Sequence, residues 1–312
     1  MHIVIPLWNK CNNKCVMCTN PVAEQSTKDG CFDFISLKKF IKKEKKRGSV
    51  IDAVYITGGE PTIRPDFFES ADYILKSLPS AKINLLSNGR RFFYPDFARK
   101  CLSFGKIDFI IPIHGWDEKS HDAVTGARGS FNQTVNGLRN LLRLRQPGQQ
   151  IEIRVIIHGI NYKKLSKIFD FLLKEFSSVE RVAAIFAEYE GHAVKNLKSV
   201  TLGYKEFYPQ FKFFEKYLVK FSELRFYHFP LCMMPEKIWP YMWRTIDEDE
   251  IIFPKKCAGC SVKGSCLGLH KNYFKLFGDK ELKPVGKDVF LVKSDNYHHP
   301  IINVQRKKPK KN

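Results

Sequence analysis

The sequence predicts an α/β fold in which six βα units form a partial barrel, followed by a small irregular extension. Short runs rich in β-branched residues alternate with longer amphipathic stretches up to about residue 190. This alternation is typical of a parallel sheet with right-handed crossovers. Six units are too few to close a barrel of eight, so we expect the barrel to stay open. Beyond residue 225 the periodic pattern gives way to prolines, tryptophans and cysteines.

The six expected strands share an apolar, β-branched character that suits burial on both faces of a sheet. We expect them at His2–Trp8, Ala53–Thr57, Lys82–Ser87, Asp108–Ile113, Ile151–Ile157 and Arg181–Ala187. Helical periodicity places helices at Ile35–Lys46, Asp66–Ser77, Pro95–Phe104, Phe131–Arg143, Lys163–Phe176 and Tyr204–Leu218. Ligands of parallel α/β folds bind where the strands end, so motifs at that edge are the functional candidates.

The length of 312 residues allows one sizeable domain with an appendage. We expect a barrel core over residues 1–225, a cysteine-rich extension over residues 226–290, and a basic tail over residues 291–312.

The chain carries 52 Lys and Arg against 32 Asp and Glu, a formal charge of +20. Such a field favours acidic partners, which include nucleic acid, an acidic peptide or an acidic redox protein. No apolar run is long enough to cross a bilayer, and the first residues lack the pattern of a secretion signal. We therefore expect a cytoplasmic protein with no membrane contact.

The chain has nine cysteines, a number that in a cytoplasmic protein favours metal binding over disulfides. Cys31 and Cys101 stand alone and are expected to be bystanders, because small buried thiols are common. The other cysteines fall into two clusters.

The first cluster follows the first strand, where Cys11, Cys15 and Cys18 have the spacing C-x3-C-x2-C. One loop with this spacing can hold three corners of a cubane cluster, because thiolates are soft ligands for iron. Three protein ligands leave one iron open for a small molecule. Structural zinc is the alternative, although it favours C-x2-C pairs and four protein ligands.

This spacing resembles the signature of the radical S-adenosylmethionine (SAM) superfamily, whose barrel is of the partial type expected here. The resemblance implies a [4Fe–4S] cluster on Cys11, Cys15 and Cys18, with SAM chelated on the open iron. It also implies that one-electron reduction splits SAM into methionine and a 5′-deoxyadenosyl radical, which abstracts hydrogen from a substrate. Met17 departs from the family pattern, which usually has an aromatic residue before the third cysteine.

The second expected strand runs into Gly58, Gly59, Glu60 and Pro61. The glycines permit close backbone approach, and Glu60 can accept a hydrogen bond from an ammonium group. By itself the string is equally compatible with a turn and a capping acid. It resembles the GGEP motif of the same superfamily, which implies that these residues hold the amino group of SAM.

Further candidates for SAM contacts lie at the ends of the third and fifth strands. Ser87 and Asn88 match a turn found in many relatives, and an ordinary Asn-Gly turn is the alternative. Arg154 lies in a strand of β-branched residues, where a charge is costly unless paired. It either binds a carboxylate, such as that of SAM, or pairs with Glu152 or another acid. His114 is expected to be structural.

The segment that contains His121, Asp122 and Gly129 resembles a recurrent HD-x-x-TG-x-x-GSF pattern of the superfamily. We expect it to be structural, with Ser130 as a helix N-cap. No motif identifies a catalytic residue. Tyr189, His192 and Cys101 are conceivable second hydrogen donors without supporting motifs.

The second cysteine cluster comprises Cys257, Cys260 and Cys266, with Cys232 as a fourth ligand. It resembles the extension of radical SAM enzymes that carry an auxiliary iron–sulfur cluster. A four-cysteine zinc site is the alternative. Either metal would stabilise a segment that lacks an obvious core of its own.

Several segments resemble the radical SAM maturases of His-Xaa-Ser peptides, among them Thr57–Thr62, Ser87–Phe92 and Pro230–Pro235. This resemblance implies a ribosomally made peptide substrate and an electron donor such as flavodoxin or ferredoxin. The alternatives are an RNA-modifying or small-molecule radical SAM enzyme and a non-catalytic metal-binding protein. The positive charge suits nucleic acid, but no RNA-binding module is recognisable.

Overall fold

The structure is a computed structural model, and it describes residues 1–20, 33–48 and 50–306. Within these residues the main sheet has eight parallel strands, which follow one another in chain order. They are β1 (His2–Trp8), β2 (Ala53–Gly58), β3 (Lys82–Leu86), β4 (Ile107–Pro112), β5 (Ile151–Ile157), β6 (Arg181–Phe186), β7 (Leu224–Tyr227) and β8 (Met242–Trp243). The α/β fold with a parallel sheet is therefore confirmed.

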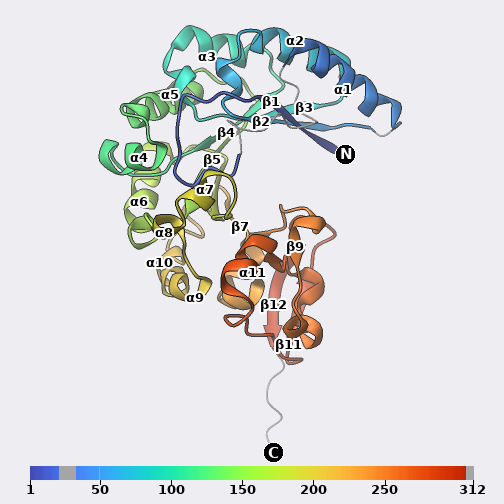
Figure 1. The fold of residues 1–312 in the computed structure, drawn as a ribbon, viewed down its shortest axis with the longest axis vertical. Helices are drawn as coiled ribbons and strands as arrows, with labels where there is room; N and C mark the ends of the chain where they lie inside the picture. The colour runs from blue at the N-terminus through green and yellow to red at the C-terminus, as the bar shows by residue number, and fades with distance from the viewer. Residues whose placement is uncertain (21–32, 49, 307–312) are drawn as a thin grey trace, which may run out of the picture.

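The crossover helices lie along the outer side of the curved sheet (Figure 1). They are α1 (Phe34–Lys46), α2 (Phe67–Ser77), α3 (Pro95–Leu102), α4 (Glu118–Thr125), α5 (Ser130–Leu144) and α6 (Leu165–Phe176). In β1 the alternate residues Ile3, Ile5 and Leu7 are buried in the main core. Because side chains alternate along a strand, His2 and Val4 face the other side and are exposed.

Short helical segments connect these elements. They are η1 (Pro61–Ile63), η2 (Arg90–Phe93), η3 (Tyr162–Lys164), α7 (His192–Lys195), α8 (Leu197–Val200), α9 (Tyr204–Phe207), η4 (Tyr208–Gln210), α10 (Phe211–Phe214), η5 (Leu231–Met233), η6 (Glu236–Tyr241), η7 (Glu248–Glu250), η8 (Lys255–Gly259) and η9 (Lys263–Ser265). The single helix expected at Tyr204–Leu218 is wrong, because Pro209 lacks an N–H group and the chain tightens there into η4.

The sheet continues past residue 225, where the sequence places the end of the barrel core. β7 pairs with β6, and β8 pairs with β7, both in parallel. These strands are four and two residues long, too short for a recognisable apolar pattern. The part of the chain beyond residue 225, called the C-terminal lobe below, therefore begins as a continuation of the sheet.

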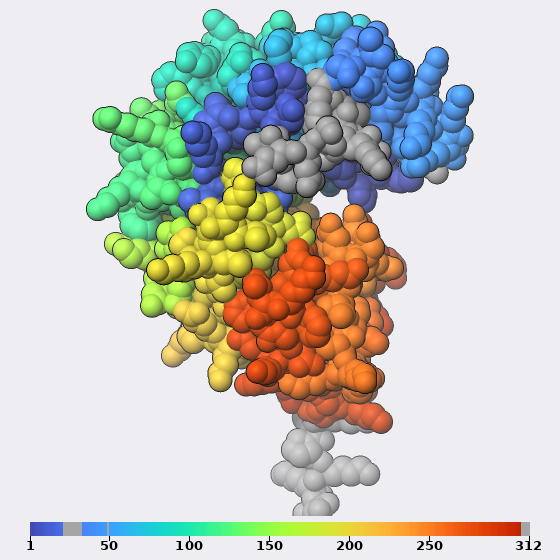
Figure 2. All heavy atoms as spheres, viewed as in Figure 1, coloured from blue at the N-terminus to red at the C-terminus, as the bar shows by residue number. Residues whose placement is uncertain are grey.

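The C-terminal lobe, shown in orange and red in Figure 2, is built from short elements. They are β9 (Ile251–Ile252), β10 (Leu269–His270), α11 (Lys271–Phe277), β11 (Val289–Lys293) and β12 (Ile301–Arg306). The basic tail expected from residue 291 is wrong up to residue 306, because β11 and β12 pair as an antiparallel hairpin. Its buried residues Val289 and Ile301 anchor it to the core, and Arg306 pairs with Asp288 at 2.6 Å. Residues 307–312 lie outside the described part.

One continuous apolar core joins the barrel to the C-terminal lobe. At the junction, Tyr204 packs against both Phe186 of β6 and Tyr273 of α11, each with ring centroids 4.3 Å apart. Among the described helices, none is long and apolar enough to cross a bilayer.

Candidate active site

The first cysteine cluster lies in the loop that follows β1, and backbone hydrogen bonds hold this loop from two sides. Lys14 and Val16 donate to the carbonyl groups of Thr125 and Val124, in the last turn of α4, at 2.7 and 2.9 Å. The carbonyl of Lys10 accepts from the N–H group of Glu60 at 2.8 Å. The loop is therefore fixed to the ends of both α4 and β2.

Gly58 and Gly59 pack directly against the start of this loop. A Cβ atom on Gly58 would lie 2.4 Å from the carbonyl oxygen of Trp8, and one on Gly59 would lie 2.2 Å from that of Lys10. Gly58 also has a φ of +120°, which disfavours any side chain. These glycines are thus required for the contact between β2 and the cysteine loop.

Glu60 is buried and accepts several hydrogen bonds. Its Oε1 accepts from the N–H group of Thr62 at 3.1 Å, from the hydroxyl of Thr62, and from the Oγ of Ser87 at 2.8 Å. Its Oε2 accepts from the N–H group of Asn88 at 2.6 Å. A carboxylate offers about four acceptor positions, so Oε2 keeps one for a further donor. Burial nevertheless raises the pKa of Glu60.

The structure brings most of the candidate residues to one cavity of about 330 Å³ at the C-terminal ends of β1 to β7. This volume lies within the range of small-ligand sites, about 300–1,000 Å³. The candidates that line it are Cys11, Cys15, Cys18, Gly58, Gly59, Glu60, Ser87, Asn88 and Arg154. Pro61 does not line it; this residue is buried at the start of η1, where its fixed φ and missing N–H group suit a helix start.

The three thiols of this cavity fit a cationic metal cluster. Burial, with repulsion from the neighbouring thiols, raises the pKa of Cys11 to about 11 and that of Cys15 to about 12. Burial also raises the pKa of Cys18. A bound cation would reverse these shifts, because it stabilises the thiolate form that ligates iron. The Sγ of Cys11 also accepts from the N–H group of Asn13 at 3.4 Å.

Both expectations for Arg154 are compatible with the structure. Its Nε donates to Oε1 of Glu152 at 2.6 Å, and Oε2 of Glu152 accepts from Arg181 at 3.0 Å. Within the described residues, the two terminal nitrogens of Arg154 have no hydrogen-bond partner. Because Arg154 also lines the cavity, it can bind a ligand carboxylate while it remains paired.

The segment around His121 is structural, as expected, but its capping residue differs. The Nδ1 of His121 accepts from the backbone N–H of His114 at 3.2 Å. Asp122 caps α5, because its Oδ1 accepts from the Oγ of Ser130 at 2.7 Å and from the N–H group of Phe131 at 2.8 Å. Ser130 is therefore the first residue of α5 and not its N-cap.

Two further titratable residues line the cavity without having been singled out in the sequence. Glu188 lies just past β6, and its position at the end of an expected strand is a signal by which the sequence could have revealed it. His228 follows β7, a strand that the sequence did not reveal. The earlier candidates for a hydrogen donor, Tyr189, His192 and Cys101, do not line the cavity. Cys31 lies outside the described residues.

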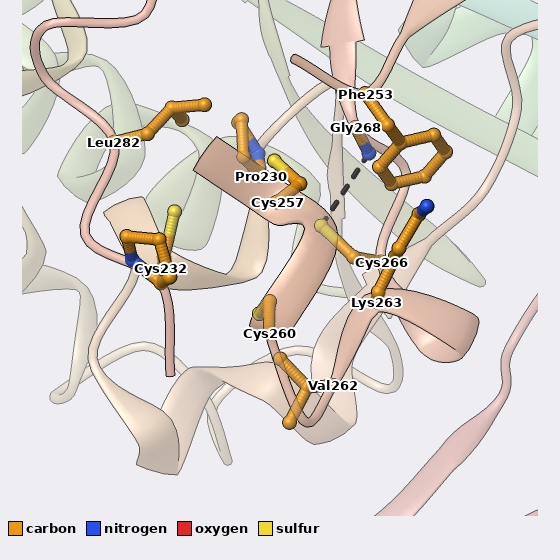
Figure 3. Close-up of a pocket in the computed structure, with 11 residues that line it drawn as sticks. Pro230, Cys232, Phe253, Cys257, Cys260, Val262, Lys263, Cys266, Gly268 and Leu282 are labelled. Atoms are coloured by element: carbon orange, nitrogen blue, oxygen red, sulfur yellow. Dashed lines mark hydrogen bonds between the residues drawn. The ribbon is translucent and has the colours of Figure 1, made fainter. Parts of the chain in front are cut away.

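The second cysteine cluster lies in the C-terminal lobe. Cys232 lies in η5, Cys257 and Cys260 lie in η8 and at its end, and Cys266 follows η9. The four cysteines line one small cavity of about 20 Å³ (Figure 3). Backbone N–H groups reach two of the sulfurs. Cys266 accepts from Leu231 at 3.3 Å and from Gly268 at 3.4 Å, and Cys260 accepts from Val285 at 3.4 Å.

No group of three or more His, Cys, Asp and Glu side chains in the described residues is placed to hold a single metal ion. A tetrahedral zinc ion requires its sulfurs about 3.8 Å apart, given a Zn–S distance of about 2.3 Å.

Comparison with known proteins yields one family model, described as the radical SAM superfamily, which matches residues 5–172. The mycofactocin maturase MftC of Mycobacterium tuberculosis (strain CDC 1551 / Oshkosh) is 31% identical over 180 residues, which cover 56% of this chain and 42% of that protein. An AdoMet-dependent heme synthase of Methanosarcina barkeri is 29% identical over 169 residues, which cover 54% and 46%. The chain thus matches less than half the length of these curated relatives.

Among solved structures, Streptococcus suis SuiB bound to its precursor peptide SuiA is similar in fold. The TM-score is 0.53 at 14% sequence identity, and the match covers 70% of this chain and 46% of SuiB.

Proposed function

We propose, because this chain belongs to the radical SAM superfamily, that it cleaves SAM reductively and abstracts hydrogen from a ribosomally made peptide. One observation carries this proposal. The three thiols, the Gly58–Glu60 turn and the turn at Asn88 all line the same cavity. A [4Fe–4S] cluster on Cys11, Cys15 and Cys18, with SAM on its open iron, would supply the 5′-deoxyadenosyl radical.

The residues around the cluster would bind and orient SAM. The open acceptor position on Oε2 of Glu60 suits the SAM ammonium group. Glu60 accepts from the Oγ of Ser87 at 2.8 Å and from the backbone N–H of Asn88 at 2.6 Å. These bonds hold both residues in place, where they present polar groups at the end of β3. The terminal nitrogens of Arg154, which have no hydrogen-bond partner among the described residues, suit a carboxylate, which fits the expected contact with SAM.

A peptide substrate is supported by the relatives. MftC is named a maturase, and SuiB has a fold like that of this chain and was solved with a precursor peptide. The heme synthase relative makes a small-molecule substrate the second candidate. The net charge of +20 supports an acidic electron donor such as flavodoxin or ferredoxin. It suits nucleic acid equally, but no other feature supports that partner. A cytoplasmic location fits oxygen-sensitive chemistry.

For residues 226–290 we propose an auxiliary iron–sulfur cluster on Cys232, Cys257, Cys260 and Cys266. The observation that supports a metal site here is that the four cysteines line one small cavity. The N–H groups that point at Cys260 and Cys266 support this, because such hydrogen bonds stabilise thiolate sulfur and tune cluster potentials.

The test is anaerobic reconstitution of the full chain with iron and sulfide, followed by SAM and dithionite. We expect 5′-deoxyadenosine, together with a mass change in a synthetic peptide encoded beside the gene. The Cys15→Ser variant should form no 5′-deoxyadenosine. Cleavage of SAM by this variant at the wild-type rate would refute the proposal. A small molecule that is converted while all peptides remain unchanged would favour the second candidate.

A further inference from the structure

Glu188 and His228 form a pair on the wall of the SAM cavity, and no sequence motif indicates this pair. Glu188 follows β6 and His228 follows the neighbouring strand β7, so the two residues meet at the C-terminal edge of the sheet. The Nδ1 of His228 lies 3.2 Å from Oε1 of Glu188 and 3.2 Å from the carbonyl oxygen of Phe186.

These contacts determine where the ring carries its proton. Both neighbours of Nδ1 are acceptors, so Nδ1 is the protonated nitrogen of the neutral imidazole. The lone pair of the neutral ring is then on Nε2. In the described part of the chain, no side chain or backbone group hydrogen-bonds to this Nε2. A histidine of the cavity wall thus has a free basic nitrogen and a carboxylate behind it.

The backbone of His228 is held in an unusual conformation. Its φ is +68°, and within the described residues no other non-glycine residue has a positive φ. Its carbonyl oxygen accepts from the hydroxyl of Tyr204 at 2.8 Å, which helps to hold the strained turn. Strain of this kind persists only where the surroundings enforce it, and it is concentrated at functional sites.

We propose that His228 is the catalytic base of this cavity and that Glu188 positions it. The inference rests on the proposed function, because it concerns the substrate bound beside SAM. The base removes a proton from a substrate group, written X–H. The X–H bond breaks, an Nε2–H bond forms on His228, and the electron pair stays on the substrate. The carboxylate of Glu188 then faces the new imidazolium, as in other base-and-orienter pairs.

The surroundings keep the ring of His228 in the unprotonated form, in which Nε2 has its lone pair. Burial, with a smaller effect of the Arg154 charge, lowers its pKa to about 3, so the ring is neutral at neutral pH. The charged and titratable groups near His228 are Glu188, Arg154 and Tyr204, together with a second histidine–glutamate pair. His270 has its Nε2 3.5 Å from Oε1 of Glu190, and it belongs to β10 of the C-terminal lobe.

The first test needs no substrate and uses diethyl pyrocarbonate, which acylates unprotonated imidazole nitrogens. We treat the reconstituted full chain anaerobically at pH 5.5 and pH 7.5 and map the modified histidines by mass spectrometry. N-acetylhistidine in the same tube should react about tenfold more slowly at pH 5.5, as its neutral fraction falls. We expect His228 to react with a change of less than about twofold, because its ring stays neutral.

Matched variants and SAM test the geometry. Glu188→Gln should slow the modification of His228 severalfold, whereas Glu190→Gln, whose side chain contacts His270 and Asn272, should not change it. Bound SAM should protect His228. An unreactive His228 in the wild-type protein, or equal reactivity in Glu188→Gln, would overturn the proposal.

The second test separates this inference from the proposed function. In His228→Gln, the amount of peptide converted per 5′-deoxyadenosine formed should fall about 100-fold or more relative to the wild type. Wild-type conversion by His228→Gln would refute the role of His228 and leave the proposed function intact. Absence of 5′-deoxyadenosine from every variant, the wild type included, would instead refute the proposed function, and the diethyl pyrocarbonate result would still decide the geometry of His228.

Discussion

The backbone N–H of Asn88 donates to Oε2 of Glu60 over 2.6 Å. This bond joins the end of β3 to the end of β2. It also directs the side chain of Asn88 toward the cysteine loop, where its Nδ2 donates to Oδ1 of Asn12 at 2.6 Å and lies 3.9 Å from the Sγ of Cys11. The buried carboxylate therefore organises the cavity wall on which the thiols lie.

Replacing Glu60 with Gln should weaken both the fold and the binding of SAM. An amide has one acceptor oxygen, so the variant leaves part of the donor set from Thr62, Ser87 and Asn88 unpaired. An unsatisfied buried donor costs about 1–3 kcal/mol. Urea unfolding should show a loss of this size, and equilibrium dialysis should show weaker SAM binding. Glu69→Gln, on the exposed side of α2, is the matched control and should leave both unchanged.

Gly59→Ala should displace the cysteine loop, because its Cβ atom would lie 2.2 Å from the carbonyl oxygen of Lys10. The reconstituted variant should lose about four irons per chain, the content of one [4Fe–4S] cluster. Gly264→Ala is the control, since a Cβ atom there meets nothing within 4 Å. Iron and sulfide analysis measures the outcome, and full iron content in Gly59→Ala would contradict the role assigned to this contact.

Cys257→Ala tests the proposed auxiliary cluster. Loss of one of its four thiol ligands should lower the iron content by up to about four per chain, with 5′-deoxyadenosine formation retained. Unchanged iron together with a loss of bound zinc would overturn the auxiliary cluster. Cys101→Ala serves as control, because this thiol is buried in the apolar core and lines neither metal cavity.

The stability of the protein should fall in mild acid, partly because of His121. Burial lowers the pKa of this histidine from its ordinary value of 6.5 to about 4. The unfolded chain then binds a proton that the folded chain does not, so stability is present above pH 6.5 and is lost between pH 6.5 and 4. One such proton gives a slope of about 1.4 kcal/mol per pH unit.

His121→Asn keeps an acceptor near the N–H group of His114 and removes the titrating group. Urea unfolding from pH 7 to 4 should show a slope that is smaller than the wild-type slope by up to one proton. An identical slope in the two proteins would show that His121 does not titrate in this range.

The strands β1 to β6 could be predicted to within one residue because each is an apolar, β-branched run between helices. β7 and β8 could not, because four and two residues carry no period that sequence analysis can recognise. The same limit concealed His228, which is placed in the cavity only by the pairing of β7 with β6. The break at Pro209, in contrast, could have been read from proline chemistry.

The sequence by itself determined which thiols lie together in the first cluster and their local geometry. Three thiols within eight residues after a strand must lie on one loop, and two glycines before Glu60 permit a close backbone contact. Only the tertiary structure decided which distant residues share that cavity, because parallel strands bring to one edge residues that are far apart in the chain. Glu60 meets Asn88, and Glu188 meets His228, through strand register, which spacing in the sequence does not encode.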